Sequence, residues 1–146
     1  MSTVKSLYHI VINTKNREMT IPEENKRQAY AYIYGVLRNR RCKLLRMNGI
    51  PNHIHLLVSM PAEESLSDLL REVKRSSSIW MQSHPEMFPR FHGWGKGYYA
   101  FSCGVREVAA IVDYIKGQES HHGVQSYDDE MKVMAIDNQC DYYEYD

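Results

Sequence analysis

The sequence predicts an α+β fold of the ferredoxin-like (RRM-like) kind: an antiparallel βαββαβ sheet with helices on one face, plus a C-terminal helix. Runs of β-branched and aromatic residues alternate with helical patterns in this order, and the second and third runs are close enough to form a hairpin. The chain has 146 residues, 43% hydrophobic and 25% charged, which is typical of one compact domain. We therefore expect a single domain over residues 1–146, with an acidic C-terminal tail at 123–146.

Four short runs are expected to form the strands. Each is rich in β-branched or aromatic residues and is bounded by polar or turn-forming segments. Residues 48–52 (Asn-Gly-Ile-Pro-Asn) have the composition of a tight turn, which predicts the hairpin. The four runs are residues 8–13, 42–47, 53–60 and 98–103.

Three helices are expected between and after these strands. The first begins at Thr20 and Pro22, followed by acids that the helix dipole favours, and the second begins at the N-cap candidate Ser65. Residues 84–97 contain two prolines and three glycines and are expected to be a loop, and a third helix follows from residue 106 to about 122. The expected core positions are Tyr30, Ile33, Tyr34 and Leu37 in the first helix and Leu66, Leu69, Leu70, Val73, Ile79 and Trp80 in the second.

Charge is distributed unevenly, although the formal net charge is zero. Residues 1–48 carry ten Lys or Arg against three acids, whereas residues 123–146 carry one against seven. The basic region is either a phosphate-binding surface or a solvated helix face. No apolar run approaches the ~18 residues of a membrane span, and no signal pattern is present, so a cytoplasmic protein without a membrane partner is expected. Cys42, Cys103 and Cys140 are too widely spaced for a disulfide framework or a four-cysteine zinc site.

The sequence Pro51-Asn52-His53-Ile54-His55 is the most informative motif. Alternate residues of a strand share a face, so His53 and His55 project together from the open face, opposite Ile54. Two neighbouring imidazoles are natural metal ligands, and the alternative is a pair of ordinary surface histidines.

The third helix carries a second motif, Tyr114-Ile115-x-x-Gln118. Tyr114 and Gln118 are four residues apart and share a helix face, and His121 and His122 follow. A tyrosine can act as a covalent nucleophile and a glutamine oxygen suits a hard divalent cation, although Tyr114 alone fits a tyrosine at the edge of the core better than a nucleophile.

Together the two motifs resemble the HUH single-tyrosine transposases of hairpin-recognising insertion sequences (the transposase A type) and their domesticated repeat-associated relatives. The resemblance extends over most of the chain. It also includes Tyr8-His9-Ile10-Val11, Val73-Lys74-Arg75-Ser76-Ser77 and Gly97-Tyr98-Tyr99-Ala100-Phe101-Ser102.

The resemblance implies a metal-dependent endonuclease and strand transferase that acts on single-stranded DNA. His53, His55 and Gln118 would bind Mg²⁺ or Mn²⁺, and Tyr114 would attack the scissile phosphate, release a 3′-hydroxyl and remain as a 5′-phosphotyrosine. The 3′-hydroxyl of a DNA strand would later attack this phosphotyrosine and rejoin the strands without ATP. Accordingly, no Gly-rich phosphate loop is present and no nucleotide cofactor is expected.

The resemblance also implies DNA hairpins and a second copy of the chain as partners. Members of the family typically form homodimers in which the tyrosine helix of one subunit completes the site of the other. The cations expected to contact phosphates are Arg38, Arg40, Arg41, Lys43, Arg46, Lys74 and Arg75.

Two other classes of function remain open from the sequence. A non-catalytic ferredoxin-like module that binds single-stranded nucleic acid would explain the basic half and the eleven tyrosines, and it would bind without metal. A small metal-dependent hydrolase or sensor would need a further Asp, Glu or Cys ligand, and the sequence offers no obvious one.

Overall fold

The computed structural model describes residues 2–121 and 126–142. It contains a four-stranded sheet in the order β2-β3-β1-β4, in which every neighbouring pair is antiparallel. The strands are β1 (Leu7–Asn13), β2 (Lys43–Ile50), β3 (His53–Ser59) and β4 (Tyr99–Cys103). The predicted α+β fold and the hairpin between the second and third strands are confirmed.

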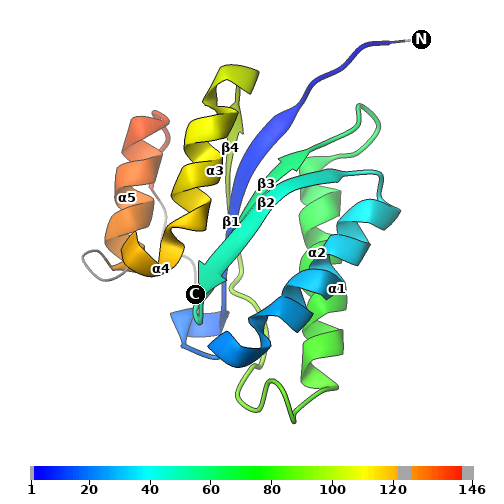
Figure 1. Ribbon diagram of the computed structural model, residues 1–146, viewed down its shortest axis with the longest axis vertical. Helices are drawn as coiled ribbons and strands as arrows, with labels where there is room; N and C mark the ends of the chain where they lie inside the picture. The colour runs from blue at the N-terminus through cyan, green and yellow to red at the C-terminus, as the bar shows by residue number, and fades with distance from the viewer. Residues whose placement is uncertain (1, 122–125, 143–146) are drawn as a thin grey trace.

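Helices cover both faces of this sheet (Figure 1). On one side lie α1 (Lys26–Asn39) and α2 (Leu66–Gln82), and on the other lie α3 (Val108–Lys116), α4 (Gln118–His121) and α5 (Tyr127–Asp137). The expectation that the second face is open is therefore wrong. The part of the chain expected to be only an acidic tail contains α5, a helix that packs over that face.

The main core lies between the sheet and the first two helices. Ile10 and Ile12 of β1 point to this side together with Ile54, Leu56 and Val58 of β3, as strand alternation predicts. The loop over residues 84–97 contributes Phe88, Phe91 and Trp94 to the same core, which holds an otherwise irregular segment in place.

The helix boundaries and faces differ from expectation at four points. The backbone at Pro22 is extended, and the N–H groups of Thr20 and Ile21 bond to the carbonyl of Pro51, so α1 begins only at Lys26. Two residues expected in the core, Tyr34 and Ile79, are 47% and 59% exposed, because they lie outside the buried faces of their helices. The last predicted helix is interrupted at Gly117, which separates α3 from α4.

None of the described helices is both long enough and apolar enough to cross a membrane.

Candidate active site

His53 and His55 are side by side on β3, on the face covered by the last three helices, and both are fully buried. Each ring is held through Nδ1. His53 Nδ1 donates to Oδ1 of Asn52 at 2.7 Å, and His55 Nδ1 lies 2.8 Å from Nε2 of His9 on β1. These contacts turn the two Nε2 atoms toward the same point, as second-shell partners of metal-binding histidines commonly do.

Burial fixes the protonation of His9. Loss of solvent is the main cause, and together with the neighbouring His55, and against an opposing effect of Glu130, it lowers the pKa of His9 from 6.5 to about 3. His9 is therefore neutral near pH 7 and can accept the proton of His55 Nδ1. That leaves His55 Nε2 as the atom that faces Glu130.

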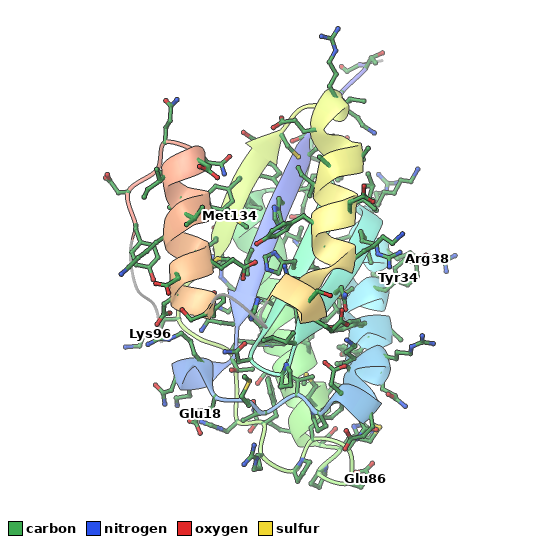
Figure 2. All side chains as sticks on the ribbon, turned by 60° about the vertical axis from the view of Figure 1, so that its left-hand side comes forward. Glu18, Tyr34, Arg38, Glu86, Lys96 and Met134 are labelled. Atoms are coloured by element: carbon green, nitrogen blue, oxygen red, sulfur yellow. The ribbon has the colours of Figure 1, made fainter. Side chains whose placement is uncertain are left out.

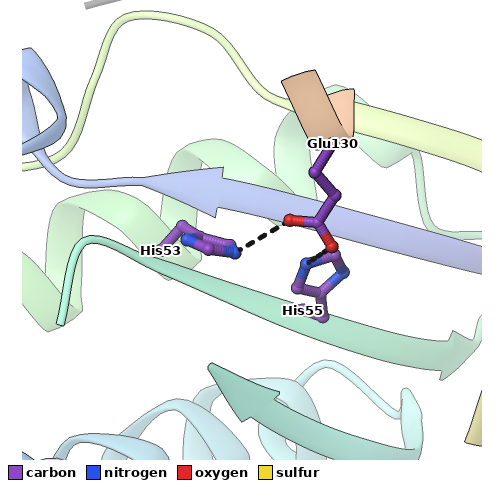
Figure 3. Close-up of side chains that lie close together, drawn as sticks. All are labelled: His53, His55 and Glu130. Atoms are coloured by element: carbon purple, nitrogen blue, oxygen red, sulfur yellow. Dashed lines mark ion pairs between the residues drawn. The ribbon is translucent and has the colours of Figure 1, made fainter. Parts of the chain in front are cut away.

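Glu130 of α5 lies opposite the two imidazoles (Figure 3). Its carboxylate oxygens are 3.3 Å from Nε2 of His53 and 3.4 Å from Nε2 of His55, and the side chain is 2% exposed. The helix is positioned by its N-cap, where the Ser126 side chain accepts from the Asp129 N–H, and by Tyr127. The Tyr127 ring lies 4.4 Å from the His53 ring, and its hydroxyl donates to Asn13.

Tyr114 projects from α3 into the same cluster. Its hydroxyl donates to Glu130, and its ring presents an edge to the rings of His9 and His55, with centroids 6.2 and 5.7 Å away. Burial and, to a lesser extent, the Glu130 carboxylate raise the pKa of the phenol well above its ordinary range. The half-buried ring lines a cavity of about 280 Å³ between α3 and α5.

Gln118 follows the break at Gly117 and is the first residue of α4. Its Nε2 donates to Glu130 at 3.1 Å, which turns Oε1 toward His53 Nε2, also at 3.1 Å. The end of α3 is anchored to β2 through Asn48, whose side-chain amide donates to the carbonyls of Ile115 and Lys116. The break therefore places the amide beside the histidines instead of letting it continue along the axis of α3.

The donor set fits a divalent cation. Ligand atoms of His53, His55 and Glu130 all lie within 4.8 Å of one another, and the Gln118 oxygen lies beside them. The Gln118 oxygen and the carboxylate can only accept, and a neutral His53 that donates from Nδ1 offers a lone pair at Nε2. Buried acceptors that converge in this way require a cation or extra protons between them, so the cluster has the chemistry of a metal site.

The structure brings together all four residues that the sequence predicts for the site: His53, His55, Tyr114 and Gln118. The expectation that the chain offers no further carboxylate ligand is wrong, because Glu130 lies at the centre of the cluster. The predictions for the neighbouring histidines are not tested, since the side chain of His121 and all of His122 lie outside the described residues.

The predicted DNA-binding cations fall into two groups. Arg40 is held by Glu64 through two hydrogen bonds of 2.6 and 3.0 Å, whereas its neighbours around the end of α1 and on β2 are exposed. We call this group the α1–β2 surface, and it consists of Arg38, Arg40, Arg41, Lys43 and Arg46. Lys74 and Arg75 belong to α2 and line a different cavity.

Comparison with known proteins now identifies the family. Residues 2–118 match the family described as "Transposase IS200 like". The chain belongs to this family of transposases. Two curated relatives align over 115 residues: the transposase for insertion sequence element IS200 of Salmonella typhimurium (27% identity, 76% of this chain and 75% of the relative) and the ISDra2 transposase TnpA of Deinococcus radiodurans (22% identity, 76% and 82%).

Two solved structures share the fold of this IS200-like transposase. One is a crystal structure from Deinococcus radiodurans described as a candidate transposase (TM-score 0.63, 21% identity, 80% of this chain and 93% of that one). The other is a REP-associated tyrosine transposase bound to a REP hairpin (TM-score 0.64, 18% identity, 84% and 72%). The ferredoxin-like sheet with its helices is thus the fold of tyrosine transposases.

Proposed function

We propose that this transposase cleaves and rejoins single-stranded DNA, with Tyr114 as the nucleophile. The observation that carries the proposal is the convergence of a phenol from α3, an amide from α4 and two imidazoles from β3 on one buried carboxylate. A structural tyrosine at the edge of the core would not need this set of partners.

The chemistry follows from the positions of these groups. The Tyr114 hydroxyl donates to Glu130, so the carboxylate is placed to take its proton as the phenol oxygen attacks phosphorus. The P–O3′ bond breaks, the leaving O3′ takes up a proton from water and becomes a 3′-hydroxyl, and the 5′-phosphate remains bonded to the Tyr114 oxygen. The phosphotyrosine bond retains the energy of the phosphodiester, so the reverse attack by a 3′-hydroxyl rejoins the strands.

We infer that His53, His55, Gln118 and Glu130 hold Mg²⁺ or Mn²⁺. The cation would supply Lewis-acid stabilisation of the charge that develops on the scissile phosphate. Asn52 and His9 orient the two imidazoles through their Nδ1 atoms, and Gln118 is oriented by its own bond to Glu130. These contacts set the ligand directions before any DNA binds.

The geometry favours a site completed within one chain, since Tyr114 and Gln118 reach histidines of their own chain. A homodimer, with or without exchange of the tyrosine helix, remains a prediction. Mixing a Tyr114→Phe variant with a His53→Ala/His55→Ala variant tests the exchange of the tyrosine helix, because adduct formation in the mixture requires a site shared between chains. We expect no adduct.

The substrate we propose is single-stranded DNA that carries hairpins, bound through phosphates by the α1–β2 surface. A denaturing gel tests the whole proposal with DNA from the flanks of the gene. Wild-type protein should form a covalent adduct only with Mn²⁺ or Mg²⁺, and Tyr114→Phe should lose the adduct but retain hairpin binding, because one hydroxyl is removed with little change in packing. Tyr34→Phe, on the exposed side of α1, is the matched control. Binding without any metal-dependent cleavage would instead indicate a non-catalytic DNA-binding module.

A further inference from the structure

Gln118 lies on a helix that is too short to hold its own position. α4 has four residues and follows the break at Gly117. A single helical turn is not stable by itself, because forming it fixes several residues for one hydrogen bond. The bond to Glu130 sets the direction of the Gln118 amide, whereas contacts on the outer side of α4 hold its backbone.

An ion pair ties the outer side of α4 to the start of α1. Lys26 Nζ lies 2.7 Å from Oε1 of Glu119, the residue that follows Gln118. A second carboxylate, Glu23, lies 2.9 Å from the same ammonium, and the Lys26 side chain is only 15% exposed. Burial acts to lower the pKa of Lys26, but the hydrogen bonds to Glu119 and Glu23 outweigh it and raise the pKa, so the side chain is charged.

Asn48 connects this ion pair to β2. Its Oδ1 accepts from Lys26 Nζ at 3.3 Å, and its Nδ2 donates to Oε2 of Glu119 at 3.3 Å. The same amide group donates to the two carbonyls at the end of α3, next to Tyr114. We call Lys26, Asn48 and Glu119 the clamp, and it holds the chain on both sides of Gly117.

The clamp is fixed to the strand beside the histidines. Asn48 of β2 is in register with His55 of β3, and paired strands do not slide past each other without breaking their hydrogen bonds. Figure 2 shows α3 and α4 in front of the sheet, with α5 on their left and α1 on their right. Gln118 is therefore held from the α1 side through Glu119 and from the α5 side by Glu130.

We propose that the clamp positions the Gln118 amide oxygen opposite His53, and that Lys26 and Asn48 are therefore positioning residues of the site. The proposal rests on the proposed function, since it takes Gln118 as a metal ligand. Without the clamp, part of the free energy of metal binding is used to order α4. Partners that orient a metal ligand typically change metal affinity by about 10- to 100-fold.

The first test compares wild-type protein with Lys26→Met in EDTA, by amide hydrogen exchange measured with NMR. The substitution keeps the aliphatic stem and removes the ammonium. The Ser120 N–H, bonded to Gly117 O at 3.0 Å, should exchange about fivefold faster, which is the largest usual contribution of an exposed ion pair. Exchange in α5 should not change. Arg71→Met is the matched control, because it removes one cation from an ion pair of 2.8 Å on α2.

The second test is a titration with Mn²⁺, in which electron paramagnetic resonance measures the free ion. Lys26→Met should bind Mn²⁺ roughly tenfold more weakly than wild type, and Arg71→Met should bind it equally well. In protein that carries Gln118→Ala, adding Lys26→Met should change the affinity by less than about twofold, because the clamp acts through the amide that is absent. Melting curves in EDTA show whether each variant is folded.

Two results would overturn the proposal. One is equal exchange of the Ser120 N–H in wild type and Lys26→Met. The other is a tenfold loss of Mn²⁺ affinity both with and without the Gln118 amide, which would mean that Lys26 supports the fold in general. If wild-type protein binds no Mn²⁺ but Ser120 exchanges faster in Lys26→Met, the proposed metal site fails and the clamp on α4 remains.

Discussion

Glu130→Gln tests the role of the carboxylate that the structure places among the predicted ligands. The substitution keeps the size of a side chain that is 2% exposed and removes its charge, 3.3 and 3.4 Å from the two histidine Nε2 atoms. Gln is a weaker ligand for a hard cation, and partners that only orient a metal ligand already affect affinity about 10- to 100-fold. We therefore expect Mn²⁺ to bind at least about a hundredfold more weakly.

This loss converts directly into thermal stability. At a metal concentration about 100 times Kd, wild-type protein gains about 2.7 kcal/mol, whereas a hundredfold weaker site gains only about 0.4 kcal/mol. For a domain of this size, 1 kcal/mol corresponds to roughly 2–4 °C in Tm. Wild-type Tm should rise by roughly 5–11 °C on adding Mn²⁺, and that of Glu130→Gln by about 1–2 °C.

Differential scanning fluorimetry with EDTA and with Mn²⁺ measures both shifts. Glu63→Gln is the matched control, because Glu63 is exposed and lies outside the site. The metal-free Tm of Glu130→Gln distinguishes loss of a ligand from loss of the fold. A full Mn²⁺ shift in Glu130→Gln would refute the assignment of Glu130 as a ligand and leave the carboxylate as a partner of Tyr114 alone.

Two further predictions concern the frame of the site. A Cβ at Gly49 would lie 2.1 Å from a backbone carbonyl of β3, so Gly49→Ala should cost about 1–3 kcal/mol of unfolding free energy and weaken Mn²⁺ binding. Gly35→Ala, where nothing lies within 4 Å, should instead stabilise the protein by about 0.4–1 kcal/mol; equal effects in urea unfolding would contradict the packing argument. For His9, the pKa of about 3 in the fold against 6.5 in the unfolded chain means that the unfolded chain binds the extra proton between these pH values. The free energy of unfolding should therefore fall as the pH drops below 6.5, and His9 contributes at most about 1.4 kcal/mol per pH unit to this fall. His9→Gln should make the fall less steep. An unchanged dependence of the unfolding free energy on pH would show that His9 is not the group responsible.

The order of strands and the pairing of His53 with His55 could be predicted because strand alternation and hairpin chemistry are local signals. His9 had the same kind of signal, since it alternates with Val11 and Asn13 on β1. However, the contact between His9 and His55 also depends on the β1–β3 register, which strand alternation alone does not set. The sharing of a helix face by Tyr114 and Gln118 was predictable, but the break at Gly117 that turns the amide toward His53 was not.

Glu130 could not be assigned from the charge of its segment, which looks like a solvated tail. One signal was present: Ser126 is followed by Asp129 three residues later, and Tyr127, Glu130 and Met131 have the spacing of one buried helix face. A carboxylate in such a stripe indicates a buried partner. Which partner it meets depends on α5 packing across the sheet, a long-range contact that no local pattern specifies.

If Tyr114 is the nucleophile, its phenol becomes joined to DNA, and mass spectrometry of the digested adduct identifies the modified residue. Trypsin should release residues 107–116, cut after Arg106 and Lys116, and Tyr114 is the sole tyrosine in that peptide. We expect this peptide to carry a nucleotide attached through its 5′-phosphate, and only when Mn²⁺ or Mg²⁺ was present. A nucleotide on another peptide, such as the one that contains Tyr127, would show that Tyr114 is not the nucleophile.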